Sequence, residues 1–528
     1  MKNLTPTGDQ SNSGVPISKG LLLINSLSGV AAKVINLLLL LWLQQYLIRR
    51  IPTEEYSLYP VFVSISMFML TAKAVFTGGI ARYLIAARAN NDNQRITEIA
   101  STTFVLNSSI ALFIFIIGLP VAFSIENFLK IDPEYYRDAR IIMALVLTSF
   151  CLKLAFATFE SGLIVEQRFV TINIINVSMT VLRLLLLFIF VVGVSPRVLW
   201  VVIATEAANM TSLLLFGIMS KKHIPALRIK LNKIRKKTVK AILSFGVWSF
   251  VGQLANRIRT AADPIILNQM AGSFTVTIYY IGSLIPRNIY QIVQHATQAI
   301  LPSLTAMYET GQGDKLSRTY IRYGRVLTWI LLFVGLPFMV LHREIMSLYA
   351  GSEYAKAGTV LLILLIAEAI EQSYSGVVKL AIASAKMKTL SILSLITQAF
   401  NLTLTLVLVG FFKYGAVGAA ASTLITRIAL EYWVFSIYGA KLAGVTYLRW
   451  FKGAFLRGII PFIVGIPVMM LLKRVWIPEN WLHIFLQACI GIIVYLIVMI
   501  GFSAGRADRK DMKRLINWIR SKMKKERN

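Results

Sequence analysis

Long apolar runs separated by short polar segments repeat along the whole chain of 528 residues. An α-helix rises 1.5 Å per residue, so about 20 apolar residues cross the roughly 30 Å hydrocarbon layer of a bilayer. Gly335 and Pro337 interrupt the ninth run, which is the weakest. The pattern predicts an all-α membrane protein with about fourteen spans, at residues 20–48, 57–85, 101–124, 141–160, 169–194, 198–220, 241–270, 274–304, 326–341, 357–384, 387–411, 415–438, 457–473 and 481–503.

The basic residues between these spans follow a strict alternation. With the N-terminus placed on the cytoplasmic side, inward segments hold 34 Lys and Arg, outward loops hold 11, and the spans hold 10. Positive charge concentrates on the cytoplasmic side of membrane proteins. The sequence therefore predicts a multi-pass membrane protein with both termini in the cytoplasm.

The polar segments also indicate an internal repeat. The second span is followed by "ARYLIAARANNDNQRITEIA" and the eighth by "LPSLTAMYETGQGDKLSRTY"; "DPEYYRDA" precedes the fourth span and "GSEYAKAG" the tenth. Six spans separate the copies, so the repeat would be parallel, about an axis along the membrane normal. Two six-helix lobes plus two C-terminal helices are expected, divided as 1–220, a basic cytoplasmic linker 221–240, 241–440, 441–505 and a basic tail 506–528.

Composition removes several classes of function. The chain is 56% hydrophobic and only 15% charged, against about 45–50% and 25% in soluble domains. The basic residues that give the chain its net charge of +31 lie between apolar runs, so they indicate contact with anionic lipids and not with nucleic acid. Cys151 and Cys489 both lie inside spans, and no nucleotide-binding, metal or catalytic motif occurs. We expect no enzyme activity, no cofactor and no metal.

Fifteen ionisable residues inside the spans are the main functional signal, because each central Arg or Lys costs roughly 2.5–3.5 kcal/mol to insert. A water-filled cavity, an acidic partner or an anionic ligand must offset that cost. The basic ones are Lys33, Lys73, Arg82, Lys153, Arg183, Arg257, Arg259, Arg287, Lys379 and Arg427. The acidic ones are Glu206, Asp263, Glu368, Glu371 and Glu431.

Spacing assigns partners to some of these residues. Arg259 and Asp263 are four apart in "VGQLANRIRTAADPIILNQM", as are Arg427 and Glu431, so each pair shares a helix face. Lys153 lies near a span end, where a long side chain can reach the interface. Arg257 projects about 160° away from Arg259 and has no partner in its own helix.

Two groups of candidate site residues remain. Lys33, Lys73, Arg257 and Arg287 occupy the first, second, seventh and eighth spans, which correspond in the two halves. They would line a cationic cavity that suits phosphate. Candidates for ion coupling or ion pairing are Glu206, Arg259, Asp263, Glu368 and Glu371.

The fourteen spans, the six-plus-six repeat and the basic hinge resemble the multidrug/oligosaccharidyl-lipid/polysaccharide (MOP) exporter superfamily. Within it, "QAILPSLTAMYETGQGDKLSRTYIRYGRVLTWI" and "GSEYAKAGTVLLILLIAEAI" look most like bacterial polysaccharide flippases of the Wzx type. The resemblance implies a V-shaped cavity and alternating access, with Lys33, Lys73, Arg257 and Arg287 as candidates to hold a diphosphate.

It also implies flipping of a polyprenyl-diphosphate-linked oligosaccharide across the bacterial cytoplasmic (inner) membrane, with polysaccharide polymerase and glycosyltransferase machinery as candidate partners. A peptidoglycan lipid-linked precursor flippase is an alternative substrate class. A cation-coupled drug antiporter is a second alternative. The first span argues against it, because it carries Lys33 and no acidic residue.

Overall fold

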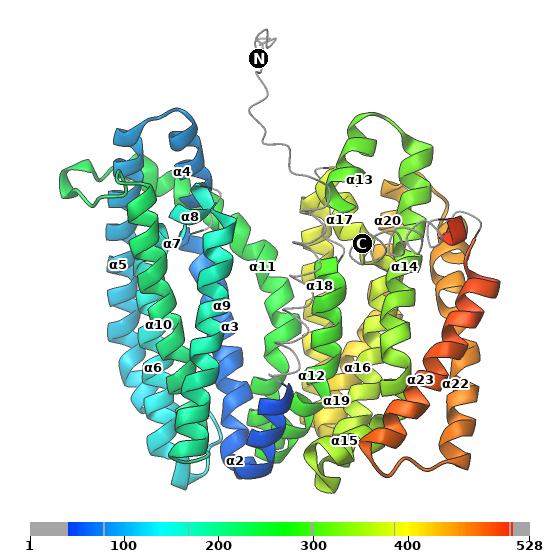
Figure 1. Cartoon of the computed structure of the whole chain (residues 1–528). Coiled ribbons are helices and arrows are strands. Elements are labelled where there is room, and N and C mark those ends of the chain that lie inside the picture. Colours follow the sequence, from blue (N-terminus) through cyan, green and yellow to red (C-terminus); the bar gives the residue numbers. More distant parts are fainter. Residues whose placement is uncertain are drawn as a thin grey trace, which may run out of the picture.

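The computed structural model describes residues 41–77, 80–166, 168–296, 300–384, 386–505 and 508–510, with only some of the side chains in 236–260 and 294–302. Every regular element in these ranges is helical, which confirms the all-α prediction. Figure 1 shows two groups of long helices standing side by side, with α11 (Lys236–Ala271) between them.

The first group follows helical residues 41–50. It contains α2 (Thr53–Tyr56), α3 (Leu58–Thr77), α4 (Ile80–Ala89), α5 (Asn93–Phe123), α6 (Tyr136–Ala155), α7 (Ala157–Glu160), α8 (Gly162–Val165), α9 (Phe169–Leu187) and α10 (Val198–His223). Its 3₁₀ turns are η1 (Ile125–Asn127) and η2 (Pro133–Tyr135), its π-helix is η3 (Phe188–Val192), and the turn η4 (Leu231–Lys233) lies in the linker.

The second group contains α12 (Ser273–Ala296), α13 (Ile300–Glu309), α14 (Gly313–Val340), α15 (His342–Ala350), α16 (Ala355–Tyr374), α17 (Gly376–Ala383), α18 (Met387–Thr405), α19 (Gly415–Thr426), α20 (Tyr432–Leu442), α21 (Tyr447–Trp450), α22 (Arg457–Val475) and α23 (Trp481–Val498). A 3₁₀ turn, η5 (Ser352–Tyr354), precedes α16. The π-helices are η6 (Leu406–Phe411), η7 (Arg427–Glu431), η8 (Phe451–Leu456) and η9 (Met499–Ser503).

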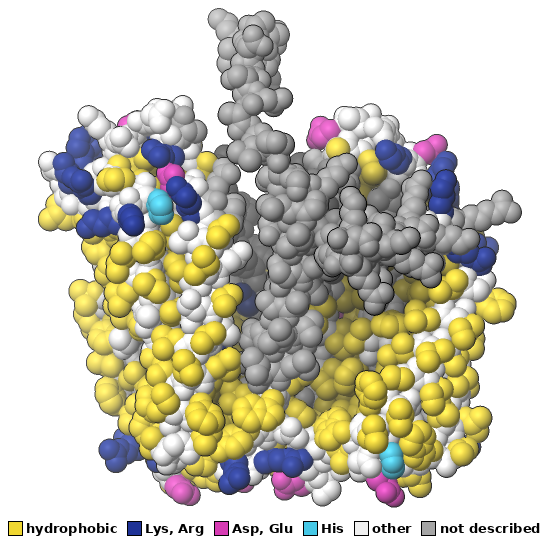
Figure 2. All heavy atoms as spheres, in the orientation of Figure 1, with side chains coloured by type: hydrophobic (Ala, Val, Ile, Leu, Met, Phe, Trp, Pro, Cys, Tyr) yellow, Lys and Arg dark blue, Asp and Glu magenta, His cyan; other side chains and the backbone are white. Residues whose placement is uncertain are grey.

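Nine helical stretches of the described chain are long and apolar enough to cross a membrane, and a tenth if the bent run 133–165 counts as one span. The first predicted span, 20–48, falls mostly outside the described residues, so the count of fourteen stays a prediction. The weak ninth span is corrected: α14 runs from Gly313 to Val340 without a break at Gly335 or Pro337. Figure 2 shows hydrophobic side chains over the flanks and Lys and Arg at the two ends, as a bilayer requires.

The internal repeat is visible in the backbone. α4 and α13 each have ten residues and end in a turn with one left-handed residue, Asn91 (φ 53°) or Gly311 (φ 67°), before a long helix. The turns η2 and η5 each end in a buried tyrosine, Tyr135 or Tyr354, and start a 20-residue helix that breaks and continues in short segments. α9 and α18 both have 19 residues and end in a π-helix. The second half therefore repeats the first, about 219 residues later.

The two C-terminal helices pack on α14. Trp329 donates from Nε1 to the Arg457 carbonyl of α22 at 3.1 Å, and the Tyr495 hydroxyl of α23 donates to the Trp329 carbonyl at 3.1 Å. Arg325 pairs with Asp508 at 2.6 Å, which fixes the start of the tail to the same helix. These contacts attach 441–505 to the second group.

Candidate functional site

The hydrogen bonds described between the two halves gather mainly at one end of the molecule. We call this end, formed by α2, η2, α15 and η5, the closed end; the opposite end, with the turns at 90–92 and 310–312 and the linker 224–235, is the linker end (Figure 1). Of the hydrogen bonds described between 41–220 and 241–505, all but one lie at or near the closed end. The exception joins α3 and α11.

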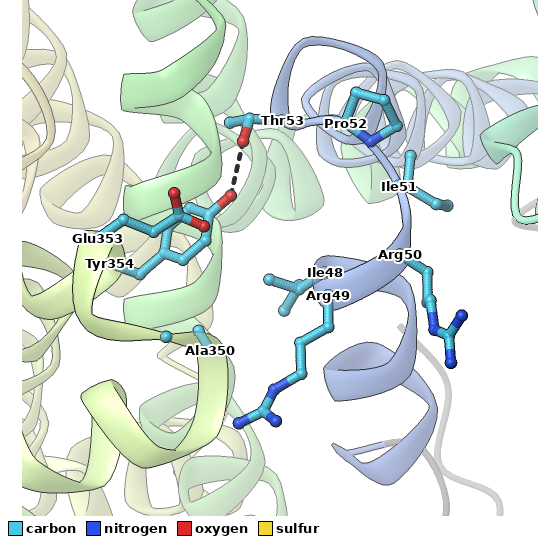
Figure 3. Close-up of a pocket in the computed structure, with 10 residues that line it drawn as sticks. Ile48, Arg49, Arg50, Ile51, Pro52, Thr53, Ala350, Glu353 and Tyr354 are labelled. Carbon is cyan, nitrogen blue, oxygen red and sulfur yellow. Dashed lines mark hydrogen bonds between the residues drawn. The ribbon is translucent and has the colours of Figure 1, made fainter.

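Side chains from both halves form the closed end. The Thr53 and Tyr354 hydroxyls are 2.6 Å apart, and Arg49 donates from Nη2 to the Leu348 carbonyl at 2.7 Å. Asn268 forms two 3.0 Å hydrogen bonds with the backbone of Lys130. Figure 3 shows the Thr53 and Tyr354 hydroxyls pointing toward each other, and both residues line a pocket of about 570 Å³ to which both halves contribute. Opening this end requires all of these contacts to break.

Arg257 makes the exceptional contact. Its Nε donates to the Thr71 Oγ1 of α3 at 2.8 Å, and the Thr71 hydroxyl in turn donates to the Met67 carbonyl. Among the described side chains, no carboxylate forms an ion pair with Arg257. A guanidinium has five N–H donors, and Thr71 takes only one of them. Within the described part of the chain, the positive charge of Arg257 is therefore not balanced by a carboxylate.

A second polar centre lies on α11 and α12. Asp263 is 6% exposed and accepts a hydrogen bond from the Tyr279 hydroxyl. The Thr405 side chain also hydrogen-bonds to Asp263, and Arg287 interacts electrostatically with it. The sequence analysis did not identify Tyr279 or Thr71 as site residues, because no pattern in the sequence marks them.

Lys73 differs from Arg257 because it has a carboxylate partner. Its Nζ lies 2.6 Å from the Glu160 Oε2, and the Lys73 side chain is 13% exposed. Glu160 belongs to α7, the short segment after the break in the fourth span. In this conformation the charge of Lys73 is therefore already compensated.

Glu206 and Lys153, which the sequence analysis treated separately, are partners. Lys153 Nζ lies 3.6 Å from the Glu206 Oε2, and that oxygen also accepts hydrogen bonds from Ser149 and Asn209. The expectation that Lys153 reaches the interface is therefore wrong, because α6 and α10 pack so that its side chain turns inward to a carboxylate.

The second half carries a related cluster around Arg427, which is 2% exposed. Its Nη2 lies 2.6 Å from Glu371 and 3.1 Å from Glu368, while Nε is 3.9 Å from Glu431. Glu431 accepts hydrogen bonds from Tyr374 and Gln398 as well. The expected Arg427–Glu431 pair exists, but it is the longest of three. Glu368 and Glu371 are therefore not a separate acidic pair.

These two clusters occupy corresponding places in the repeat. Ser149 and Glu368 match across the 219-residue offset of α6 and α16, and Asn209 and Arg427 match at 218 residues. The arrangement of charges is reversed between the halves. The first half has a base on α6 and an acid on α10, whereas the second half has acids on α16 and a base on η7. Each half thus crosslinks its fourth and sixth spans internally by an ion pair.

Two expected site residues are not placed: Lys33 lies outside the described residues, and so does the side chain of Arg259. The expected Arg259–Asp263 pair therefore stays a prediction. Within the described chain, no group of three His, Cys, Asp or Glu residues is arranged to hold a metal ion.

The comparisons with known proteins agree with this architecture. Residues 22–308, more than half of the chain, match the model of a family described as polysaccharide biosynthesis protein. The chain is 18% identical over 437 residues to the uncharacterized membrane protein EpsK of Bacillus subtilis (strain 168), covering 83% of this chain and 86% of EpsK.

Two solved structures have similar folds at 15% identity. The lipid II flippase MurJ, in an inward closed conformation, aligns over 89% of this chain and 97% of its own with a TM-score of 0.67. An inward-facing multidrug resistance MATE family transporter of the MOP superfamily aligns over 78% and 96% with a TM-score of 0.65. Both similarities establish the fold.

Proposed function

Because the chain belongs to the family described as polysaccharide biosynthesis protein and shares its fold with transporters of the MOP superfamily, we propose that it flips a polyprenyl-diphosphate-linked oligosaccharide across the cytoplasmic membrane by alternating access. The single observation that supports this most is Arg257, a cation within a span whose described partner is the neutral Thr71. An anionic headgroup would offset its cost in the membrane. Transporters of this family are not enzymes, and the chain needs no chemical step for this task.

The diphosphate would enter between the two groups of helices from the linker end, which the positive-inside rule assigns to the cytoplasm. Arg257 and Arg287 would bind the phosphates by charge-assisted hydrogen bonds, together with Lys33 from the first span. Lys73 would join them only by exchanging Glu160 for phosphate. The polyprenyl tail would stay in lipid throughout, because its transfer into a polar cavity is unfavourable.

Translocation would follow when the closed end separates and the linker end closes. The lobes would be 1–220 and 241–440, with 441–505 moving together with the second through Trp329 and Arg457. Each lobe would move as one body because its own ion pair, Lys153–Glu206 or Arg427–Glu371, ties its helices together. The basic linker 221–240 and tail 506–528 would bind anionic lipid of the cytoplasmic leaflet.

Asp263 is our candidate for ion coupling. Glu206, Glu368 and Glu371 already pair with cations in this conformation, whereas the described hydrogen bonds to Asp263 come from the Tyr279 and Thr405 hydroxyls. Asp263 interacts electrostatically with Arg287, so phosphate bound to Arg287 would change the balance of charge at Asp263. A proton or sodium ion at Asp263 would then be linked to substrate binding.

Reconstituted vesicles test the proposal. Purified chain is inserted into liposomes with a fluorescent short-sugar undecaprenyl-diphosphate lipid, and membrane-impermeant dithionite reports the fraction that has crossed. The wild-type chain is expected to flip this lipid and Arg257→Ala to lose flipping, while Arg474→Ala, a control at the far end of α22, keeps it. A chain that moves only lipid II would be a peptidoglycan precursor flippase, and one that moves only organic cations would be a drug antiporter.

A further inference from the structure

A narrow apolar groove runs along the outside of the first group, beside the closed end. Helical residues 41–50 form one wall, and α9 with η3 forms the other. Its volume is about 250 Å³, and its lining is almost entirely apolar: Trp42, Leu43, Tyr46, Val181, Leu184, Leu185, Leu187, Phe188, Val191 and Val192.

The groove has a packed floor and exposed walls. Leu43, Leu187 and Val191 are at most 7% exposed, whereas Trp42 and Phe188 are 58% and 62% exposed. The wall residues stand at the depth of the two spans that carry them, where the surrounding solvent is hydrocarbon. A chain of methylene or isoprene units is therefore the natural occupant. At about 250 Å³, the groove is smaller than the pockets of about 300–1,000 Å³ that hold compact drug-sized molecules, so it has room for one chain.

A cation stands at the mouth of this groove. Arg50 ends the helix that carries Trp42 and Tyr46, and its Cζ lies 5.7 Å from the centre of the Tyr46 ring, which itself lines the groove. Figure 3 shows Arg49 extending toward the segment at Ala350 and Arg50 extending the other way. Arg49 is engaged with the Leu348 carbonyl. In the described part of the chain, Arg50 forms no ion pair with a carboxylate.

We infer that this groove is an exit site that holds the tail of a flipped polyprenyl-diphosphate lipid, with Arg50 binding its diphosphate. The inference rests on the proposed function. A single chain with an anionic end matches a single-chain groove that ends at one arginine, because guanidinium binds phosphate through two parallel hydrogen bonds. The closed end lies directly beside Arg50, so a headgroup released there would already be next to this site.

Photo-crosslinking reads occupancy of the groove directly. The full chain, in nanodiscs of neutral phosphatidylcholine, is irradiated with undecaprenyl diphosphate that carries a benzophenone on its tail, and the adducts are mapped by mass spectrometry. We expect adducts within 41–46 or 181–192, displaced by unlabelled undecaprenyl diphosphate. Arg50→Gln should reduce them about tenfold, the loss expected for a charge-assisted hydrogen bond.

The matched control is Arg474→Gln, an exposed arginine near the end of α22 at the same side of the membrane, which should leave the adducts unchanged. Filling the groove with Leu184→Trp should remove them while α9 remains helical. Adducts elsewhere, equal displacement by neutral undecaprenol, or equal displacement by phosphatidylglycerol would each overturn the inference.

The two proposals fail separately in this design. Arg257→Ala is expected to abolish flipping but keep the groove adducts, because cross-linking needs no transport. A wild-type chain that labels the groove without flipping any polyprenyl lipid would contradict the proposed function alone. A chain that flips normally but never labels 41–46 or 181–192 would contradict the exit site alone.

Discussion

Arg257 of α11 donates a hydrogen bond to the Thr71 hydroxyl of α3 at 2.8 Å, and so joins the two halves away from the closed end. A charged donor on a neutral acceptor fixes the direction of the guanidinium without neutralising it. The contact therefore holds a cation ready for an anionic ligand.

Flipping should depend on this charge more than on its neutral partner. Arg257→Ala is expected to reduce the rate at least about tenfold, since a hydrogen bond to a charged group contributes about 1.5–3 kcal/mol. Thr71→Val keeps the charge and should cost only a few-fold. Dithionite assays on equal amounts of reconstituted protein compare the two. Equal losses would show that the contact matters only for packing.

Lys73 and Glu160 offer a test between an ion pair and a substrate site. If their 2.6 Å contact is purely structural, Lys73→Met lowers stability and the double variant with Glu160→Gln recovers it, because no charge is left uncompensated. If Lys73 also binds phosphate, the double variant regains thermal stability but not flipping. Melting temperature and flipping rate separate these outcomes when they are measured on the wild type, Lys73→Met, Glu160→Gln and the double variant.

The Arg427 cluster should be the most sensitive ion-pair site in the second half. Arg427→Leu removes the buried cation that pairs with the buried Glu431 and the half-buried Glu368 and Glu371, and losing one partner of a buried pair costs about 3–5 kcal/mol. We expect a clear fall in melting temperature in detergent. Lys379→Leu, on α17 of the same half, is the control and should change it little. A stable Arg427→Leu protein would show that these ion pairs contribute little to the stability of the second half.

Locking the closed end should stop transport. In a chain with Cys151 and Cys489 replaced by Ala, cysteines at Thr53 and Tyr354 are joined by a short bifunctional thiol reagent, because the native hydroxyls are 2.6 Å apart. Flipping should stop when the two cysteines are linked. It should return when a cleavable form of the linker is cut by a reducing agent.

The control for this lock joins two positions within the second half. Glu344 and Lys473 form an ion pair at 2.8 Å, so cysteines there can be linked in the same way. That link should leave flipping intact. Transport that continued with Thr53 and Tyr354 joined would show that the two halves do not separate at this end.

One glycine sets the distance between α12 and α16. A Cβ built on Gly282 would lie 2.6 Å from the Ala357 carbonyl oxygen, which is closer than real contacts allow. Gly282→Ala should therefore destabilise the protein by about 1–3 kcal/mol. Gly217, also helical, has nothing within 4 Å, so Gly217→Ala should be neutral or slightly stabilising. Thermal unfolding of the two variants provides the comparison, and equal melting temperatures would contradict the packing argument.

The sequence by itself determined the helices, the membrane environment and the repeat, because these depend on apolar length and on local signals. Asn91 and Gly311 mark the same turn in each half, and the Glu-Tyr pairs at 134–135 and 353–354 mark the same 3₁₀ turn. Spacing also found the Arg427–Glu431 pair, since residues four apart share a helix face.

Only the tertiary structure decided which charges are compensated. Lys73 and Glu160 are 87 residues apart, and Arg427 and Glu368 are 59 apart, so no periodicity within one helix connects them. From the sequence alone, Lys153 was expected to reach the membrane interface, but the packing of α6 against α10 brings its side chain to Glu206. The cost of a charge in a membrane is set by what lies within a few ångströms of it, and packing between helices distant in sequence fixes those neighbours.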